Sequence, residues 1–451
     1  MRKVLLLLLV LSTAAIQGQC WQSVSAGFVR SFGIKSDGTL WAWGQNSTGL
    51  LGDGTYVDRS SPVRIGTASN WQAIAMGDFH TIGLKTDGTL WAWGQNFDGQ
   101  LGDGTNTSRA TPVQIGTATN WQAISAGFGF NLAKKADGTL WTWGQNSAGQ
   151  LGLGLGNVDV LVPTQITGMT NCISFSAGGA HALIIKSNGT LWACGLNSSG
   201  QLGIGSSVNK NTYVQVGTAA DWRMVSAGGY NSFAIKNANT LWSWGQNQNG
   251  ALGTGDLFNR NVVGAVGSST DWQTVYAGDY HMMAKKTNGT LWACGGNAFG
   301  VGQFGTMSPL QLSTATNWDA VSVGDAHFLA TKTDHTLTVS GGNYYGQIGN
   351  GTSMNSVVLG QVSCSSLDTS EFNGRDLVFM ISPNPVQSAL DIYIPLQKKI
   401  DYLTISDMLG KEIYRQYGNT QRINVSQLQN GMYLLRLFSN GMVYDNKFIK
   451  Q

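Results

Sequence analysis

Charged residues, proline and long apolar runs are all scarce in this chain, and each shortage excludes a class of protein. Only 11% of the 451 residues are charged, 7 are proline, and the formal net charge is +3. Without a basic patch, we expect no nucleic-acid partner and no electrostatic attachment to a membrane surface. No apolar run is long enough to cross a bilayer, so we expect no stable transmembrane segment.

The first 19 residues have the pattern of a secretory signal peptide. Two basic residues precede a short apolar run, 4–11, and a stretch of small and polar residues. We expect export followed by cleavage between residues 15 and 19. Cys20 leaves a lipoprotein as an alternative, although the residues before it differ from the Leu-x-small pattern that such processing resembles.

Glycine is abundant, and a repeat accounts for it. The 61 glycines and an apolar fraction of 42% indicate many tight turns around a core, and no Gly-X-Y period suggests collagen. The stretch DGTLWAWGQN occurs at 37–46 and 87–96, and altered copies follow at 137–146, 188–197, 237–247, 288–297 and 334–343. Seven copies, each too small to bury its own apolar face, predict a repeat architecture.

Each copy contains four short strand-like runs separated by turn signals. In the second copy the runs are 71–75, 81–84, 89–93 and 112–115. The Asp-Gly pairs predict two-residue hairpin turns in which both central residues have positive φ. Four strands in each of seven units predict an all-β fold, a seven-bladed β-propeller around a central channel.

The repeated strand predicts its own packing. Alternation places Leu40, Ala42 and Gly44 on one face and Trp41 and Trp43 on the other. We expect the rings of one blade to fill the space that such small residues leave in the next, because each buried indole removes roughly 150 to 250 Å² from water. Six tryptophans are therefore assigned to the core: Trp41, Trp43, Trp91, Trp93, Trp141 and Trp143.

The order of motifs within each copy resembles a known repeat. Trp-x-x-Val/Ile-x-x-Gly is followed by Gly-x-x-His, Lys-x-Asp-Gly-Thr-Leu-Trp-x-Trp-Gly-x-Asn, Gly-Gln-Leu-Gly and Pro-Val-x-Ile-Gly. This order is similar to the regulator-of-chromosome-condensation repeat over residues 21–362. The resemblance implies a seven-bladed propeller whose loops bind other macromolecules, among them a small GTPase in nuclei and a β-lactamase outside bacteria.

The composition changes after residue 362. We expect a Ser-rich linker over 363–376 and a small Ig-like β-sandwich over 377–451, because short alternating strands there lie between Gly and Asn turns. SPNP, D-x-x-G, L-x-x-G-x-Y and a terminal KFIK occur in order and resemble the C-terminal sorting domain of type IX secretion cargo. The resemblance implies that this tail engages the type IX secretion machinery, and that the propeller, residues 20–362, is secreted or held at the outer-membrane surface.

Four of the five histidines occupy one place in their copies, three residues after a glycine: His80, His181, His281 and His327. A ring of imidazoles suggests metal, but adjacent blades lie too far apart for zinc bonds of about 2 Å. We expect these histidines to form structural hydrogen bonds within their blades, and we expect neither a metal nor a cofactor.

The residues just before this place differ between copies, so they are the candidates for binding. Aromatic side chains predominate, and three aspartates lie nearby. The predicted binding rim consists of Phe28, Phe79, Phe128, Tyr230, Tyr280, Asp78, Asp279 and Asp325, with Ala180 and Ala326 completing the ring. Exposed aromatic side chains commonly anchor recognition of a partner. The alternative is that these rings pack between neighbouring turns.

An exported chain can form disulfides, and two of the five cysteines flank the ring. Cys20 precedes the first blade and Cys364 follows the last, so a Cys20–Cys364 bond would join the ends of a closed ring. We interpret Cys172, Cys194 and Cys294 as small buried thiols, with a Cys172–Cys194 bond as the alternative.

These features favour a secreted or surface binding module that recognises a protein or glycan through one propeller face. No Ser/His/Asp or Cys/His constellation stands apart from the repeat, so we expect no enzyme. Two alternatives stay open. One is a secreted hydrolase that uses the channel mouth, and the other is nucleotide exchange on a GTPase, which an exported chain would not meet.

Overall fold

A computed structural model describes residues 21–296, 306–362, 380–382, 386–393, 400–407, 411–418, 420–439 and 442–451. The chain forms two compact units, residues 1–366 and 367–451. Every regular element in the described ranges is a β-strand. The described residues contain no helix long and apolar enough to cross a membrane. The all-β prediction is confirmed. The expected signal peptide and linker lie outside these ranges.

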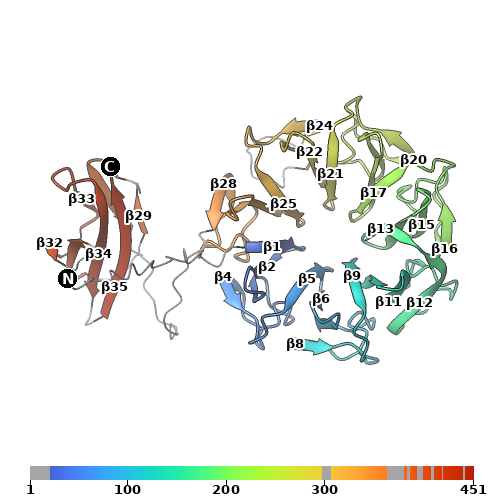
Figure 1. Cartoon of the computed structure of the whole chain (residues 1–451), viewed down its shortest axis with the longest axis horizontal. Coiled ribbons are helices and arrows are strands. Elements are labelled where there is room, and N and C mark those ends of the chain that lie inside the picture. The colour runs from blue at the N-terminus through green and yellow to red at the C-terminus, as the bar shows by residue number, and fades with distance from the viewer. Residues whose placement is uncertain are drawn as a thin grey trace, which may run out of the picture. The chain divides into compact units, whose positions relative to one another are not determined.

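Seven four-stranded antiparallel sheets make up the larger unit, and each is built from four consecutive strands. We number them as blades 1 to 7 in chain order. Figure 1 shows the blades around a central channel, with the first strand of each blade innermost. The seven-bladed propeller is confirmed, and the four runs predicted in the second copy match the four strands of blade 2 to within a few residues.

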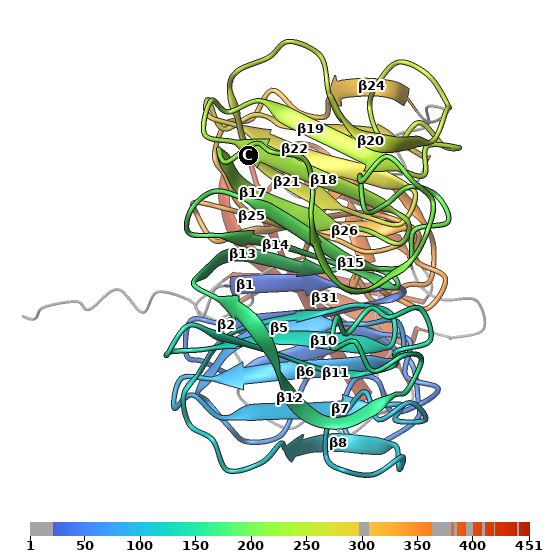
Figure 2. The ribbon, with the colours of Figure 1, turned by 90° about the vertical axis from the view of Figure 1, so that its right-hand side faces the viewer.

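The strands of blades 1 to 3 are β1 (Trp21–Ala26), β2 (Arg30–Lys35), β3 (Leu40–Gly44), β4 (Arg59–Arg64), β5 (Trp71–Met76), β6 (His80–Lys85), β7 (Leu90–Gly94), β8 (Arg109–Gln114), β9 (Trp121–Ala126), β10 (Phe130–Lys135), β11 (Thr139–Gly144) and β12 (Val160–Thr170). The longest of these, β12, runs across the outside of blade 3 (Figure 2).

The strands of blades 4 to 7 are β13 (Cys172–Ala177), β14 (His181–Lys186), β15 (Leu191–Gly195), β16 (Lys210–Gln215), β17 (Trp222–Ala227), β18 (Asn231–Lys236), β19 (Leu241–Gly245), β20 (Arg260–Ala265), β21 (Trp272–Ala277), β22 (His281–Lys286), β23 (Leu291–Gly295), β24 (Thr306–Gln311), β25 (Trp318–Val323), β26 (His327–Lys332), β27 (Leu337–Gly341) and β28 (Ser356–Val362).

A hydrogen bond from the third strand ties a blade to the one before it. The indole Nε1–H of Trp93 donates to the carbonyl oxygen of Leu50, 2.9 Å away in the preceding blade. Three other indoles donate across their junctions in the same way: Trp43 to Gln347, Trp143 to Gln100 and Trp244 to Gln201. All four indoles are fully buried, so water does not compete for these bonds.

Cysteine takes the place of this tryptophan in blades 4 and 6. The thiols of Cys194 and Cys294 lie 3.4 and 3.3 Å from the carbonyl oxygens of Gln150 and Ala251, so the same junction bond is kept with a weaker donor. Cys172, Cys194 and Cys294 are buried free thiols, which excludes the alternative Cys172–Cys194 bond.

A glycine of the preceding blade makes room for each of these indoles. A Cβ added to Gly52 would lie 2.8 Å from Nε1 of Trp93, and one on Gly349 would lie 2.6 Å from Nε1 of Trp43. Each ring therefore fills the space beside a loop glycine. The strand pattern had predicted that the rings fill the space beside small strand residues such as Ala42 and Gly44. Alternation within one strand does not show which loop of the neighbouring blade a side chain meets.

The Asp-Gly turns differ from the two-residue type that was predicted. Gly38 has a φ of +76°, whereas Asp37 has a negative φ. The N–H of Gly38 donates to the carbonyl of Lys35 at 2.9 Å, so the turn is longer, with the glycine at its left-handed position. The Asp37 carboxylate accepts hydrogen bonds from the N–H and the hydroxyl of Thr39 at 3.0 and 2.6 Å, and these bonds stabilise the longer turn.

Blade 7 and blade 1 meet through contacts of the same kind as the other blades. Besides the bond from Trp43 to Gln347, the N–H of Ala26 donates to the hydroxyl of Ser322 at 2.8 Å. Each of these two sheets consists of its own four strands, so no strand is exchanged between them. Cys20 and Cys364 lie outside the described residues, and their disulfide stays a prediction.

The smaller unit consists of two sheets that share one core. Its strands are β29 (Met380–Ser382), β30 (Ala389–Tyr393) and β33 (Arg422–Asn424) in one sheet, and β31 (Tyr402–Asp407), β32 (Glu412–Tyr417), β34 (Gly431–Ser439) and β35 (Met442–Lys450) in the other. Leu390 and Ile423 from the first sheet pack in the same cluster as Leu403, Leu435 and Phe448 from the second. This is a two-layer β-sandwich.

Replacing Trp93 by Phe tests the junction bond. We expect Trp93→Phe to lower the free energy of unfolding by about 1 to 3 kcal/mol, because a buried hydrogen bond is lost and a void is left. Trp91→Phe is the matched control, since the half-buried Trp91 donates only to Thr89 of its own blade. Urea unfolding followed by circular dichroism measures both. Equal losses would show that the junction bond has no special role.

Candidate functional site

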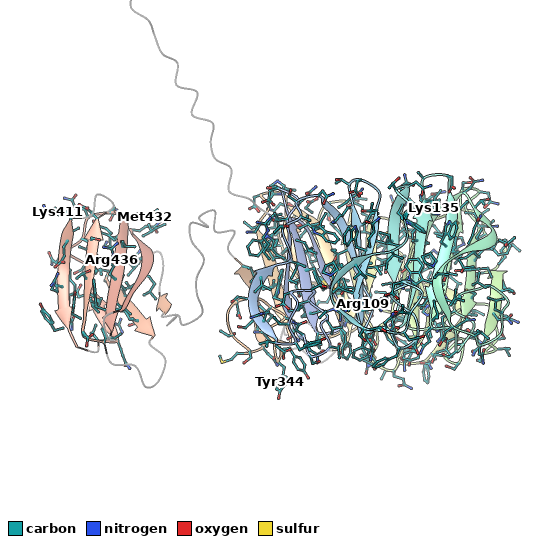
Figure 3. All side chains as sticks on the ribbon, turned by 90° about the horizontal axis from the view of Figure 1, so that it is seen from below. Arg109, Lys135, Tyr344, Lys411, Met432 and Arg436 are labelled. Atoms are coloured by element: carbon teal, nitrogen blue, oxygen red, sulfur yellow. The ribbon has the colours of Figure 1, made fainter. Side chains whose placement is uncertain are left out.

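One face of the propeller carries all residues of the predicted rim. In each blade the turn between the first and second strands opens on this face, and the loop between the third and fourth strands begins beside it. For example, the N–H of Gln95 donates to the carbonyl of Phe79 at 2.7 Å. We call this side the loop face, and the opposite side, with the Asp-Gly turns, the hairpin face. Tyr344 from such a loop and Lys135 at the end of β10 lie on opposite sides of the propeller (Figure 3).

A glycine begins each turn at the channel because neighbouring blades come very close there. A Cβ added to Gly77 would lie 2.3 Å from the carbonyl oxygen of Gly127 in the next blade, and 2.3 Å from the ring of His80. A backbone hydrogen bond joins the same two turns, from the N–H of Asp78 to the carbonyl of Phe128 at 3.3 Å. The seven turns surround one end of the channel, which we call the mouth.

The two residues after that glycine complete the turns around the mouth, and here the predicted rim needs correction. The first-position residues are Phe28, Asp78, Phe128, Gly179, Gly229, Asp279 and Asp325, and the second-position residues are Val29, Phe79, Gly129, Ala180, Tyr230, Tyr280 and Ala326. The prediction placed all five aromatic residues at the second position, which is wrong for Phe28 and Phe128. Counting from the glycine in the sequence would have separated the two sets.

Three carboxylates line one cavity of about 270 Å³ at the mouth, those of Asp78, Asp279 and Asp325. Burial, together with repulsion from the other two carboxylates, raises the pKa of Asp279 to about 7. Burial and repulsion from Asp325 outweigh the attraction of Arg30 and raise the pKa of Asp78 to about 6, and burial also raises the pKa of Asp325. Ionising all three together is therefore unfavourable in the free protein.

Arg30 lies near the mouth but does not pair with these carboxylates. Its fully buried guanidinium donates to the backbone carbonyls of Gly77, Asp78 and His80 at 2.6 to 2.7 Å. Burial lowers the pKa of Arg30 to about 10, so the group stays charged at neutral pH. Neither Asp279 nor Asp325 forms an ion pair with any residue in the described ranges.

Aromatic rings occupy the rest of the mouth. The ring centroids of Phe28 and Phe79 lie 6.4 Å apart. The Phe128 ring of blade 3 reaches past blade 4 to Tyr230 of blade 5, with centroids 6.3 Å apart and the rings edge to face. Gly179 in blade 4 permits this reach, because a Cβ there would lie 2.8 Å from the Phe128 ring. Aromatic contacts therefore gather over blades 1 to 5.

Several rings on the loop face are open to solvent. Phe79 and Tyr280 beside the mouth are 42% and 44% exposed. The loops between third and fourth strands expose Tyr56 by 65%, Phe97 by 68% and Tyr344 by 79%, in the neighbouring blades 1, 2 and 7. No signal in the sequence pointed to these three residues.

The four histidines are fully buried behind the mouth. Nε2 of His80 lies 2.8 Å from Oδ1 of Asn131 in the next blade. Two further pairs at the same distance are His181 with Ser232 and His327 with Ser31. These bonds cross between blades, so the expectation of bonding within a blade was wrong for these three histidines. Burial lowers the pKa of His80 to about 4 and the pKa of the other three to about 3, which keeps the rings neutral.

The Ser31 and His327 pair has the residue types of a nucleophile and its base, but the hydrogen bond between them runs in the wrong direction for catalysis. The Ser31 hydroxyl donates to the carbonyl of Gln347 at 2.8 Å, so the imidazole Nε2–H donates to the serine oxygen. An activated serine needs the opposite arrangement. No group of three or more His, Cys, Asp or Glu side chains in the described part of the chain is placed to hold a metal ion.

Family models match both units of the chain. A model described as the regulator of chromosome condensation (RCC1) repeat matches residues 37–84, 87–133, 137–185, 188–235 and 239–284, and a second model of that description matches 21–49, 71–100, 121–150, 172–201, 224–251 and 272–301. A model for a secretion system C-terminal sorting domain matches residues 380–451, which supports export of the chain to the cell surface or beyond it.

Known relatives are similar over the repeats. The secretion-regulating guanine nucleotide exchange factor of Mus musculus is 44% identical over 57 residues, which are 12% of this chain and 12% of that protein. The structure of human WBSCR16 has 20% identity and a TM-score of 0.66, covering 72% of this chain and 94% of its own. Yeast RCC1 (Prp20), solved with Kap60, has 18% identity and a TM-score of 0.65, covering 77% and 86%.

The structural likeness, at these identities, shows the fold alone. The repeat matches also show the family, because one repeat model by itself matches more than half of the residues of the chain. The chain belongs to the regulator of chromosome condensation (RCC1) repeat family.

Proposed function

We propose that the propeller is an exported binding module whose loop face recognises another protein. The observation that carries this proposal is the mouth itself. There the exposed rings of Phe79 and Tyr280 directly follow Asp78 and Asp279, whose carboxylates have no ion-pair partner within the described structure. Exposed rings and crowded carboxylates are both unfavourable in the free protein. A partner that covers them and supplies complementary groups relieves both.

The breadth of the exposed surface favours a protein over a glycan as the partner. Exposed Tyr56, Phe97 and Tyr344 lie in loops of blades 1, 2 and 7, well beyond the ring of turns at the mouth. Tyrosine and phenylalanine are enriched at protein interfaces, which usually bury more surface than one sugar can cover. A glycan remains the alternative ligand for the same face.

Two other functions have weaker support. Hydrolysis at the mouth would use its carboxylates, but the serine and histidine pairs of the fold are buried and hold their protons in the unsuitable direction. Nucleotide exchange on a GTPase rests on the likeness to the mouse exchange factor, and that likeness covers only 57 residues of the chain. An exported protein does not meet an intracellular GTPase.

We also propose an export route for the chain. Residues 1–19 act as the signal peptide, and residues 377–451 are the tail that the type IX secretion machinery recognises, consistent with the sorting-domain match over 380–451. The propeller then works outside the cell, either released or attached to the outer-membrane surface.

Removing the exposed rings at the mouth tests the binding proposal. The full chain is immobilised, proteins from the cell surface and medium are captured and identified, and one of them is purified for titration. We expect Phe79→Ala, Tyr230→Ala and Tyr280→Ala combined to weaken its Kd at least tenfold, because interface rings commonly contribute more than 1 kcal/mol each.

The control for this experiment is Ile173→Ala on the hairpin face, which removes an apolar side chain that is 53% exposed at the start of β13. Circular dichroism confirms that each variant folds. If the captured protein binds the folded triple variant as tightly as the native chain, the rings at the mouth are not its binding site. A captured glycan in place of a protein would establish the alternative ligand.

Asp279→Asn tests the claim that ionising the crowded carboxylates at the mouth destabilises the free protein. Because burial and repulsion raise the pKa of Asp279 to about 7, the folded state binds more protons than the unfolded state between about pH 4 and pH 7, and stability falls as the pH rises through this window. We expect the variant to be more stable than the native chain at pH 8, with the difference vanishing near pH 4. Thermal unfolding across this range checks it, and a variant less stable at pH 8 would refute the claim.

A further inference from the structure

Two blades place an aspartate followed by an aromatic residue at the mouth. Asp78 with Phe79 in blade 2 and Asp279 with Tyr280 in blade 6 each put a carboxylate at the first position and an exposed ring at the second. Exposed rings attract organic cations through their π-faces, and carboxylates attract them by charge. A carboxylate next to an exposed ring is therefore suited to an ammonium or a guanidinium group.

We propose that the mouth receives the ammonium or guanidinium group of a lysine or arginine carried by the protein partner. This inference rests on the proposed function of the loop face and adds the chemistry of the side chain that enters the channel.

The cavity has room for such a group. Its volume is about 270 Å³, and its wall includes the small residues Ala26, Ser125, Ala177, Ser226 and Ala277 beside the larger Met76, Ile124, Tyr276 and Val323. A side chain that enters from the loop face carries its cation deepest. The cation then lies at the level of the three carboxylates, while the alkyl stem passes the outer edge of the mouth.

The carboxylates have acceptor capacity that the described structure leaves unused. Oδ1 of Asp325 has no contact with solvent and no hydrogen-bond donor. The backbone N–H of Gly229 acts on Asp279 only in the direction that lowers its pKa. Each ionised carboxylate has about four lone-pair sites, and an ammonium brings three donors where a guanidinium brings five. An incoming lysine or arginine therefore supplies the groups that are lacking.

The cations of the propeller near this site are engaged elsewhere. Three N–H groups of Arg30 are occupied by backbone carbonyls, so it lowers the pKa of Asp78 without bonding to its carboxylate. The lysines that end the second strands lie at the hairpin face and stack on tryptophan, as Lys135 does 3.8 Å from the ring centroid of Trp141. The negative charge of the mouth is thus open to a cation from outside.

A peptide-binding measurement with the full chain tests the inference. The probe is a fluorescein-labelled peptide, Gly-Gly-Lys-Lys-Gly-Gly, with matched peptides that carry glutamate or norleucine in place of lysine. We expect fluorescence anisotropy to show at least tenfold tighter binding of the lysine peptide than of either matched peptide. Asp279→Asn with Asp325→Asn should weaken the lysine peptide at least fivefold, and it should fold, because it removes charges that are unfavourable at neutral pH.

The matched control is Asp137→Asn with Asp334→Asn, which removes the same charge from two exposed aspartates of the hairpin face. If both double variants lose affinity equally, attraction is non-specific and the inference is wrong. Displacement of the peptide by equimolar n-butylammonium would assign the mouth to a free amine and overturn the protein source. If the captured partner needs the rings but not Asp279 and Asp325, the proposed function stands and this inference fails.

Discussion

The hydrogen bond from the third strand to the preceding blade is the contact on which the propeller depends. Trp93 donates to Leu50, and at the junctions where cysteine replaces the indole, Cys194 and Cys294 still reach the equivalent carbonyl. The acceptor belongs to the main chain of the preceding loop. The spacing between blades is therefore set by backbone positions, which persist when side chains change. Ser340, at this place in blade 7, donates to the carbonyl oxygen of Ser356 in its own blade.

The fixed spacing explains why the mouth can vary while the blades do not. With the blades held this closely, the turns meet at the channel, and the site of Gly77 has no room for a side chain. Most of the residues at the two positions after the glycine carry side chains at the mouth, and Gly179 is an exception, because a Cβ there would meet the carbonyl of Gly229 and the Phe128 ring. At the first of these two positions the chain uses aspartate in three blades, phenylalanine in two and glycine in two. A symmetric scaffold thus presents an asymmetric surface, which is what recognition of one partner requires.

The sequence predicted the scaffold well because each copy repeats the same local signals. The strands of blade 2 and the place of Cys172 at the start of β13 both follow from alternation and period. Contacts between copies could not be predicted from these local signals. The bonds from His80 to Asn131 and from Trp93 to Leu50 join residues of different copies, and only the ring geometry brings them together. The reach of Phe128 to Tyr230 depends on Gly179, which lies in the copy between theirs.

The remaining question is why three carboxylates stay crowded beside a buried cation. A guanidinium can satisfy up to five acceptors, but Arg30 uses its donors on three carbonyls and thereby fastens blade 1 to blade 2. Its bonding is structural, and only its charge acts on Asp78. Asp279 and Asp325 gain nothing from it by hydrogen bonding. One set of groups at the mouth thus holds the fold closed, and the carboxylates of Asp279 and Asp325 are left without an ion-pair partner in the described structure. Stability and the proposed recognition therefore depend on different atoms at the same place.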